Sequence, residues 1–201
     1  SSTFMSFHTD GCCSSGLSFN SETWLDFNGI NTWKRYHLIV DLLREDYART
    51  PVKPTVCLEN TYEDHNYDGE FRDEWYVRFQ GYWCAFSGSA GYAYGHKDAY
   101  KLTESAEWPQ VLDKPGRLDI QHLKSLLAAY PFETLEPAQD MLVSDEGSAQ
   151  VEKTYIAATR STTGDYALVY TTQGDSFSLD LTGLSSNSLK VQWFDPREGT
   201  Y

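Results

Sequence analysis

The sequence predicts an α/β region followed by an all-β region, on the basis of three observations. Residues 3–94 alternate short apolar runs with amphipathic segments at helical spacing, which is typical of parallel, buried strands joined by helices. A further helical segment follows the last of these strands. From residue 154 onward, short strand-like runs are separated by Gly-Asp turns, as in antiparallel sheets. The 201 residues, with 40% hydrophobic content, can hold one medium domain or two small ones.

The α/β region begins with two mostly apolar runs, residues 3–7 and 24–30, which predict strands separated by a Gly/Ser-rich loop. Residues 34–49 place apolar side chains on one helical face and charged ones on the others, so they predict an amphipathic helix. The two prolines that follow end this helix. Residues 55–58 then predict a short buried strand.

The second half of this region repeats the pattern. A polar loop over residues 60–71 leads to a predicted helix over 73–86, and residues 88–94 form a strand of small residues. A long loop precedes a last helix that we expect to start near Asp119 and to end at Pro131. Four parallel strands result, which is too few to close a barrel of eight.

The all-β region is predicted to be an antiparallel sandwich or meander. Turn signals separate its early strands. The expected strands are residues 155–160, 166–171, 177–181 and 189–194. Since the chain opens without an initiator Met and stops just after a turn-like segment, we expect the natural protein to extend beyond both ends.

Composition excludes several classes of function. With 16 basic and 29 acidic residues the formal net charge is −13, which argues against a nucleic-acid partner. No run approaches the ~20 apolar residues that a membrane span needs. The histidines and the four cysteines, Cys12, Cys13, Cys57 and Cys84, lack metal-ligand spacing, so neither a metal nor a cofactor is expected, and the pairing of the cysteines stays open.

Candidate functional residues are those that follow the predicted strands, because parallel α/β folds place functional groups at the carboxyl ends of strands. These residues are His8, Asn31, Glu59 and His96. Glu59 is the sharpest candidate, since a buried strand would deliver its carboxylate to the functional edge. The two histidines could hydrogen-bond sugar hydroxyls or serve a structural role.

Glycoside cleavage needs two carboxylates, and one Glu supplies half of that mechanism. Glu63 and Asp64 lie close to Glu59 in sequence, but acids of this loop more simply pair with Arg72 or solvent. Aromatic side chains near the strand ends could stack on sugar rings or serve ordinary packing. They are Trp24, Trp33, Tyr62 and Tyr94.

Residues 50–63, Thr-Pro-Val-Lys-Pro-Thr-Val-Cys-Leu-Glu-Asn-Thr-Tyr-Glu, resemble a segment of apiosidase-like glycoside hydrolases. That segment reads Thr-Pro-x-Lys-Pro, two apolar residues, Asp-Gly-Glu-Pro and then Tyr-Glu, so Glu59 falls on the family's Glu. Residues 7–8, 24–28 and 82–96 resemble further strand ends and the last barrel helix and strand of the same family. Residues 166–170 and 193–197 resemble the collagen-binding-type domain that accompanies such barrels.

The resemblance implies a fold and an activity. Residues 1–132 would be the C-terminal half of a TIM-type (β/α)8 barrel, and residues 133–201 a small antiparallel β-sandwich, truncated at its end. The whole protein would be a secreted or periplasmic retaining glycosidase acting on plant-type or other complex polysaccharide. Glu59 would be the nucleophile on the seventh barrel strand. The acid/base carboxylate would lie on the fourth strand, outside this chain, which would leave the fragment inactive by itself.

Their positions at or near the strand ends make His8, Asn31, Tyr62, Tyr94 and His96 the predicted oligosaccharide-binding residues. The sequence departs from the family pattern at Cys57-Leu58 and Asn60, where the family has Asp-Gly and Pro, and at residues 31–34, where it has Gln-Ser-Gly-His. These departures leave open a non-catalytic carbohydrate-binding or adhesive protein. A third alternative is an unrelated binding module that uses the region from residue 154 onward.

Overall fold

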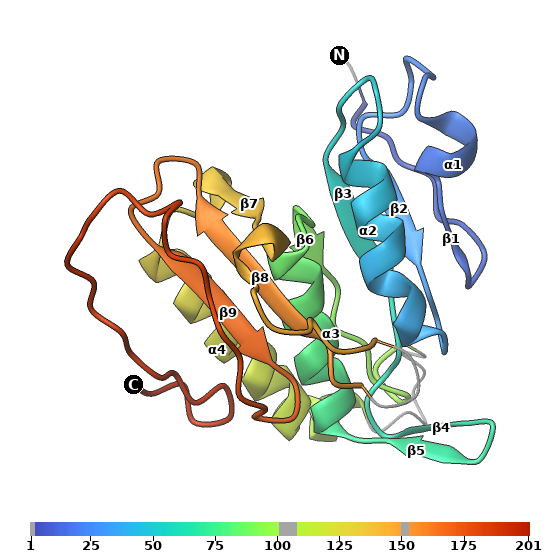
Figure 1. The fold of residues 1–201 in the computed structure, drawn as a ribbon. Helices are drawn as coiled ribbons and strands as arrows, with labels where there is room; N and C mark the ends of the chain where they lie inside the picture. Colours follow the sequence, from blue (N-terminus) through green and yellow to red (C-terminus); the bar gives the residue numbers. More distant parts are fainter. Residues whose placement is uncertain (1–2, 101–107, 150–152) are drawn as a thin grey trace.

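The structure is a computed structural model, and it describes residues 3–100, 108–149 and 153–201 (Figure 1). A mixed α/β sheet forms the N-terminal part. Its strands, in spatial order, are β1 (Cys13–Ser14), β2 (Asn28–Asn31), β3 (Thr55–Glu59) and β6 (Gly91–Tyr92). β2, β3 and β6 are parallel, whereas β1 runs antiparallel to β2. The prediction of four parallel strands is therefore wrong for one of them, since the described sheet has three parallel strands and one antiparallel strand.

The missing parallel strand is the one predicted over residues 3–7. The carbonyl of Met5 accepts a hydrogen bond from the Asp26 amide at 2.9 Å, and the Ser6 hydroxyl donates to the Phe27 carbonyl at 2.9 Å. Residues 5 and 6 thus lie beside residues 26 and 27, just before β2, without forming a ladder. The short β1, from the Gly/Ser-rich loop, pairs with β2 instead.

Helices connect the parallel strands as the periodicity predicts. A one-turn helix α1 (Gly16–Phe19) follows β1, and a 3-10 turn (Tyr36–Leu38) leads into α2 (Ile39–Tyr47) between β2 and β3. Helix α3 (Glu74–Phe86) joins β3 to β6. It begins at the N-cap Asp73, whose carboxylate accepts the Trp75 amide at 3.2 Å.

The last helix of this part, α4 (Pro115–Ala129), starts four residues before the predicted Asp119. Pro115 occupies its first turn, where proline has no amide hydrogen to leave unpaired and its fixed φ suits the helix. Short 3-10 turns flank α4 at Trp108–Val111 and Phe132–Thr134, and another lies at Gln139–Met141.

The predicted polar loop over residues 60–71 contains a β-hairpin. Its strands are β4 (His65–Tyr67) and β5 (Glu70–Arg72). The two-residue turn between them is Asp68-Gly69, and both residues have positive φ, 55° and 88°. Asp-Gly at this position is the favoured sequence for a tight hairpin turn, because the left-handed conformation suits Gly and is tolerated by Asp.

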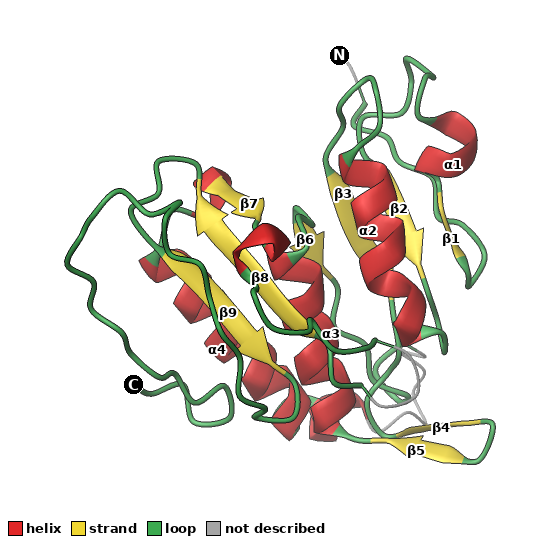
Figure 2. Cartoon of the chain, in the orientation of Figure 1, coloured by secondary structure: helices red, strands yellow, loops and turns green. Residues whose placement is uncertain are grey.

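The C-terminal part is a single antiparallel sheet. Its strands are β7 (Leu135–Pro137), β8 (Ile156–Ser161) and β9 (Ala167–Thr171). The predicted strands over 155–160 and 166–171 are thus confirmed to within a residue. Those over 177–181 and 189–194 are not strands in the described chain, which shows only loop after β9 (Figure 2). Residues 178–180 make backbone hydrogen bonds to residues 141–143.

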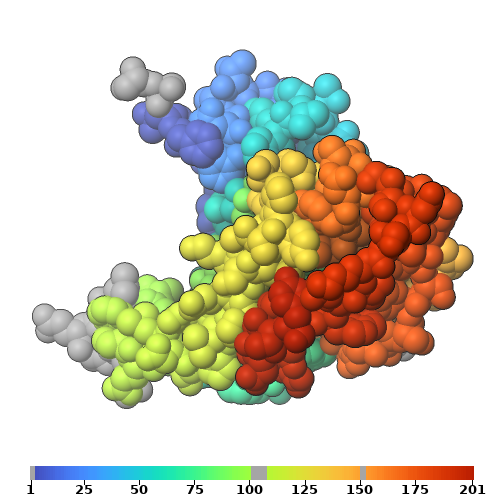
Figure 3. Space-filling view, turned by 90° about the vertical axis from the view of Figure 1, so that its left-hand side faces the viewer, coloured from blue at the N-terminus to red at the C-terminus, as the bar shows by residue number. Residues whose placement is uncertain are grey.

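The segment after β9 folds back over the molecule. In the space-filling view it lies against β8 and β9 and reaches α4 (Figure 3). A Cβ atom on Gly199 would meet the His122 ring of α4 at 2.3 Å. The apolar side chains over 189–193 remain outside, with Val191 and Trp193 79% and 74% exposed, because no second sheet covers them in the described residues. The structure describes one sheet where a sandwich needs two facing layers.

Helix α3 joins the two parts into one core. Its Phe79 and Trp83 are fully buried. On one side α3 packs against α2, and on the other side against α4, β8 and β9. Tyr82 stacks on Tyr170 with ring centroids 4.2 Å apart, and the Trp83 indole donates to the Thr172 hydroxyl at 2.9 Å. A helix that is apolar nearly all round must be covered on all sides, which explains this central position.

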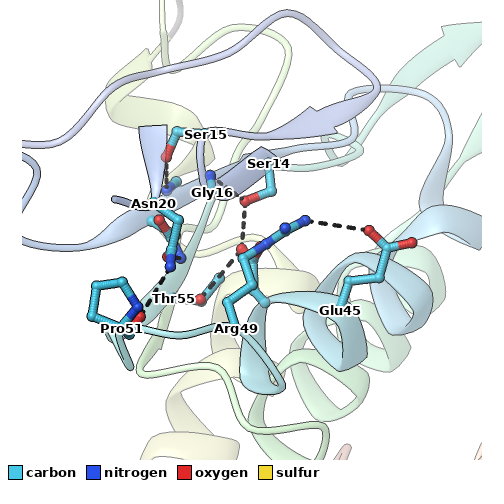
Figure 4. A network of polar contacts seen from close by, with 11 residues as sticks. Ser14, Ser15, Gly16, Asn20, Glu45, Arg49, Pro51 and Thr55 are labelled. Atoms are coloured by element: carbon cyan, nitrogen blue, oxygen red, sulfur yellow. Dashed lines mark hydrogen bonds and ion pairs between the residues drawn. The ribbon is translucent and has the colours of Figure 1, made fainter. Parts of the chain in front are cut away.

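A buried carboxylate fixes the strand ends opposite the candidate site. Asp46, at the end of α2, accepts hydrogen bonds from the Ser14 and Thr55 hydroxyls and pairs with Arg49 at 2.8 Å (Figure 4). Its side chain is fully buried. These contacts tie β1, β3 and α2 together, so the buried charge is matched by donors.

Candidate functional site

The candidate site lies at the carboxyl ends of β2 and β3. Glu59 is the last residue of β3, and its carbonyl accepts the amides of Thr32 at 2.9 Å and Trp33 at 3.4 Å. The register between the two strands shifts between Ile30 and Asn31. Irregularities of this kind re-aim a side chain at a strand end, and here Asn31 turns toward Glu59.

Three side chains contact the Glu59 carboxylate. The Asn31 amide donates to Oε2 at 2.9 Å, and the Tyr62 hydroxyl donates to Oε1 at 2.5 Å. His8 Nε2 lies 3.5 Å from Oε2. The Glu59 side chain is 27% exposed, so it is held by polar neighbours and still reachable from solvent. Four of the residues predicted from the sequence are therefore brought together.

Tyr62 is suited to remain a donor. Burial raises the pKa of its hydroxyl, and the hydrogen bond to Glu59 and the charge of Glu59 raise it further. Gly95 lies beneath its ring, where an added Cβ would come within 2.1 Å of Tyr62 Cδ1. Only a residue without a side chain at position 95 leaves this room, so the backbone there sets the distance from the hydroxyl to Glu59.

Asn31 is oriented by a second hydrogen bond from the same amide group, to the Thr9 carbonyl at 3.0 Å. Its Oδ1 atom is buried and has no hydrogen-bond partner among the described residues. Unpartnered buried side-chain acceptors are rare in folded proteins.

Aromatic residues complete the cleft around Glu59. The cleft has a volume of about 230 Å³. It is lined by Trp33, Glu59, Tyr62, His65, Tyr67 and Tyr100. Trp33 has the left-handed φ of 46° and packs edge-on against Tyr67, and Lys34 pairs with Asp68 of the hairpin at 2.6 Å. The hairpin thus becomes a wall of the cleft.

His65, Tyr67 and Tyr100 were not among the residues predicted from the sequence. The Asp-Gly turn at 68–69 was the available signal, because it predicts the hairpin that carries the first two. Nothing in the local sequence places Tyr100 beside Tyr62, with ring centroids 5.7 Å apart.

Tyr94 and His96 belong to a second polar cluster. The Tyr94 hydroxyl donates to Glu63 Oε2 at 2.5 Å, and the amide of Gly116 in α4 donates to Glu63 Oε1 at 3.0 Å. Glu63 is 1% exposed, and neither Tyr94 nor His96 lines the cleft around Glu59. The substrate-binding roles of Tyr94 and His96 stay a prediction. In the structure, the hydroxyl of Tyr94 binds Glu63.

Asp64 is engaged in the same cluster. It pairs with Lys114 at 2.5 Å and with His96 at 3.2 Å. Burial raises the pKa of Asp64, but the hydrogen bonds from Lys114 and His96 outweigh burial and hold the pKa below its ordinary value. Glu63 and Asp64 are thus occupied at the start of α4, and Arg72 pairs with Glu70 instead, at 2.7 Å.

The cysteines lie outside the cleft. Cys57 and Cys84 are buried in the core, where burial raises the pKa of the Cys84 thiol well above its ordinary value, and Cys12 and Cys13 form a disulfide. Within the described ranges, no group of three or more His, Cys, Asp or Glu side chains is placed to hold a metal ion. No described helix has the length and apolar character to cross a membrane.

Two family models match the chain. One, described as "Apiosidase-like, catalytic domain", matches residues 1–134. The other, described as "Putative collagen-binding domain of a collagenase", matches residues 137–201. Curated proteins give no match.

Several solved structures are similar to the chain, and two of them cover 90% of it. A glycoside hydrolase family 5 protein from Bacteroides vulgatus has a TM-score of 0.79 and 28% identity, and a second protein, titled a glycoside hydrolase, has 0.78 and 25%. The chain spans 46% and 47% of the length of these two proteins. These likenesses and the mixed sheet are consistent with part of a TIM-type barrel followed by a β domain.

Proposed function

Because the chain belongs to the apiosidase-like glycoside hydrolase family, we propose that the whole protein is a retaining glycosidase in which Glu59 is the nucleophile. One observation carries the assignment: the Glu59 carboxylate ends a parallel strand in an aromatic-lined cleft and accepts hydrogen bonds from Asn31 and Tyr62. Sugar rings stack on aromatic faces, and a carboxylate held by donors is pre-aimed at the anomeric carbon.

The proposed reaction has two steps. The Glu59 carboxylate attacks the anomeric carbon while the glycosidic C–O bond breaks, and an acid from the part of the protein outside this chain protonates the leaving oxygen. Water then attacks the same carbon, the acid group accepts the proton of that water, and Glu59 is released. Donation from Tyr62 and Asn31 holds the carboxylate in one orientation through both steps.

The departures from the family pattern at residues 57 and 58 do not reach the cleft. Cys57 is fully buried in the core, and Leu58 packs beside Gly29, where an added Cβ would lie 2.5 Å from the Leu58 side chain. The alternative of a non-catalytic carbohydrate-binding or adhesive protein therefore loses the support of these two positions. In the other departure, Trp33 lines the cleft and Asn31 donates to Glu59, so these two residues would alter substrate choice.

Other parts of the proposal rest on the sequence resemblance. These are the complex, plant-type polysaccharide substrate, the secreted or periplasmic location, and the division into residues 1–132 and 133–201. The start of β7 at Leu135 supports the division. The name of the second matching family, a collagen-binding domain, makes collagen a partner to test for residues 137–201.

The test is hydrolysis of a panel of aryl glycosides and plant oligosaccharides by the whole natural protein, wild type and Glu59→Gln. Activity that falls by a factor of about 10⁴ or more, with an unchanged melting temperature, supports the assignment. Azide added to Glu59→Ala should give a glycosyl azide of inverted configuration if Glu59 is the nucleophile. Glycan binding without cleavage by either protein would favour the binding role instead.

A further inference from the structure

A second hollow adjoins the cleft around Glu59. It has a volume of about 380 Å³, in the range of pockets that hold a small ligand. It is lined by Asp64, His65, Asn66, Phe71, Lys97, Asp98 and Tyr100. The hairpin that carries Phe71 extends from the N-terminal end of α3 (Figure 1). We call this hollow the hairpin lobe.

The hairpin lobe and the Glu59 cleft share two walls, His65 and Tyr100. The His65 ring stacks on Tyr67 with centroids 4.1 Å apart, and the Tyr100 ring packs against Tyr62, the hydroxyl donor to Glu59. The two hollows are therefore neighbouring parts of one groove, separated by a ridge of rings.

The lining of the hairpin lobe has the properties of a sugar subsite. Phe71 is 55% exposed, which leaves a large aromatic surface for stacking, and Tyr100 forms another part of the wall. Asn66 and Asp98 supply amide and carboxylate groups for hydroxyls. A surface with apolar rings and a few polar groups suits a pyranose or furanose ring, which has an apolar face and a hydroxyl-bearing rim.

The charges around the hairpin lobe are close to balance. Asp64 is compensated by Lys114 at 2.5 Å, and the remaining lining residues include one Lys and one other Asp, Lys97 and Asp98. An acidic sugar would meet carboxylates, and an amino sugar would meet a lysine. This lining therefore favours an uncharged sugar over a charged one.

We propose that the hairpin lobe binds the neutral sugar residue next to the one held at Glu59, so that the substrate is an oligosaccharide or polysaccharide with at least two adjoining neutral residues. This rests on the proposed glycosidase function. Stacking on Phe71 would lower the free energy of the bound oligosaccharide and leave a substrate that ends at the Glu59 cleft unaffected.

The test compares Phe71→Ala with wild type in the whole natural protein. Two substrates of the same sugar are used, a neutral oligosaccharide and an aryl monoglycoside. We expect kcat/KM to fall about tenfold for the oligosaccharide, mostly through KM, and to stay within about twofold for the monoglycoside. Trp193→Ala removes an aromatic ring that is 74% exposed and lies in neither hollow, so it should change neither value.

Equal losses on both substrates, or no loss on either, would overturn the inference. Calorimetric binding of the oligosaccharide to Glu59→Gln, with and without Phe71→Ala, gives a readout that needs no turnover. If nothing is hydrolysed but Phe71→Ala weakens oligosaccharide binding about tenfold, the proposed function fails and the subsite stands. Tighter binding of an oligosaccharide of uronic acids than of the neutral one would refute the neutral-sugar assignment. Should Phe71→Ala melt early, Asp98→Asn with the same two substrates replaces it.

Discussion

Glu63 lies four residues after the proposed nucleophile, and its replacement by Gln distinguishes a structural acid from a catalytic one. The carboxylate is 1% exposed and accepts hydrogen bonds from Gly116, in the first turn of α4, and from the Tyr94 hydroxyl. An added Cβ on Gly116 would lie 2.6 Å from Glu63 Oε2, so the carboxylate occupies the space that a side chain would need. This geometry assigns Glu63 to helix capping.

The size of the effect follows from the contacts. A hydrogen bond to a charged group contributes about 1.5–3 kcal/mol and one to a neutral group about 0.5–1.5 kcal/mol, so neutralising the acceptor of two such bonds removes about 2 kcal/mol. A negative charge at a helix N-terminus contributes about 0.3–1 kcal/mol more. Glu63→Gln should therefore lower the free energy of unfolding by about 2–3 kcal/mol and the melting temperature by several degrees.

The assay is thermal unfolding of the whole natural protein, paired with kcat/KM on its best substrate. We expect Glu63→Gln to melt early and to keep kcat/KM within about tenfold of wild type at a temperature where it is folded. Glu22→Gln, at an exposed position, is the matched control and should change neither. A normal melting temperature together with a loss of activity by a factor of about 10³ or more would refute the capping role and make Glu63 a catalytic acid.

Three further predictions use other contacts. Gly95→Ala should displace the Tyr62 ring, because the added Cβ would clash with it. We expect kcat to fall about 5–100-fold, while the melting temperature stays within a few degrees of wild type. Unchanged kinetics would show that Tyr62 does not position the nucleophile. Burial raises the pKa of Asp119 to about 6 despite its contact with Arg78, so the folded protein retains a proton that the unfolded chain releases, and stability from this group falls as pH rises from 3.8 to about 6. In urea unfolding across that range, the free energy of unfolding of wild type minus that of Asp119→Asn should fall as the pH rises, and a difference that rises would contradict the argument. Asp46→Asn weakens the hydrogen bonds and the ion pair of a fully buried carboxylate, so it should lower the free energy of unfolding in urea by about 2–3 kcal/mol. A loss below about 0.5 kcal/mol would mean that the charge of Asp46 is not needed for stability.

Local sequence signals were sufficient where one segment decides its own conformation. Periodicity placed α2, α3, β3, β8 and β9, because an amphipathic or buried run carries its pattern in adjacent residues. It failed over residues 3–7, an apolar run that lies beside the start of β2 but makes too few backbone hydrogen bonds to form a strand. It failed again over 189–193, where an apolar run has no second sheet to pack against in the described residues.

The sequence by itself determined the family, the α/β-then-β order and the position of Glu59 at a strand end, because motif spacing and hydrophobic period are properties of contiguous residues. Only the tertiary structure decided which neighbours that carboxylate has. Asn31 meets it from the end of β2, Tyr62 meets it from the loop just after β3, the hairpin supplies a wall of the cleft, and Glu63 is held away from it by α4. The contacts of Asn31 with Glu59 and of Glu63 with Gly116 join residues 28 and 53 positions apart, whose approach depends on the packing of several elements, so a local pattern carries no signal for them.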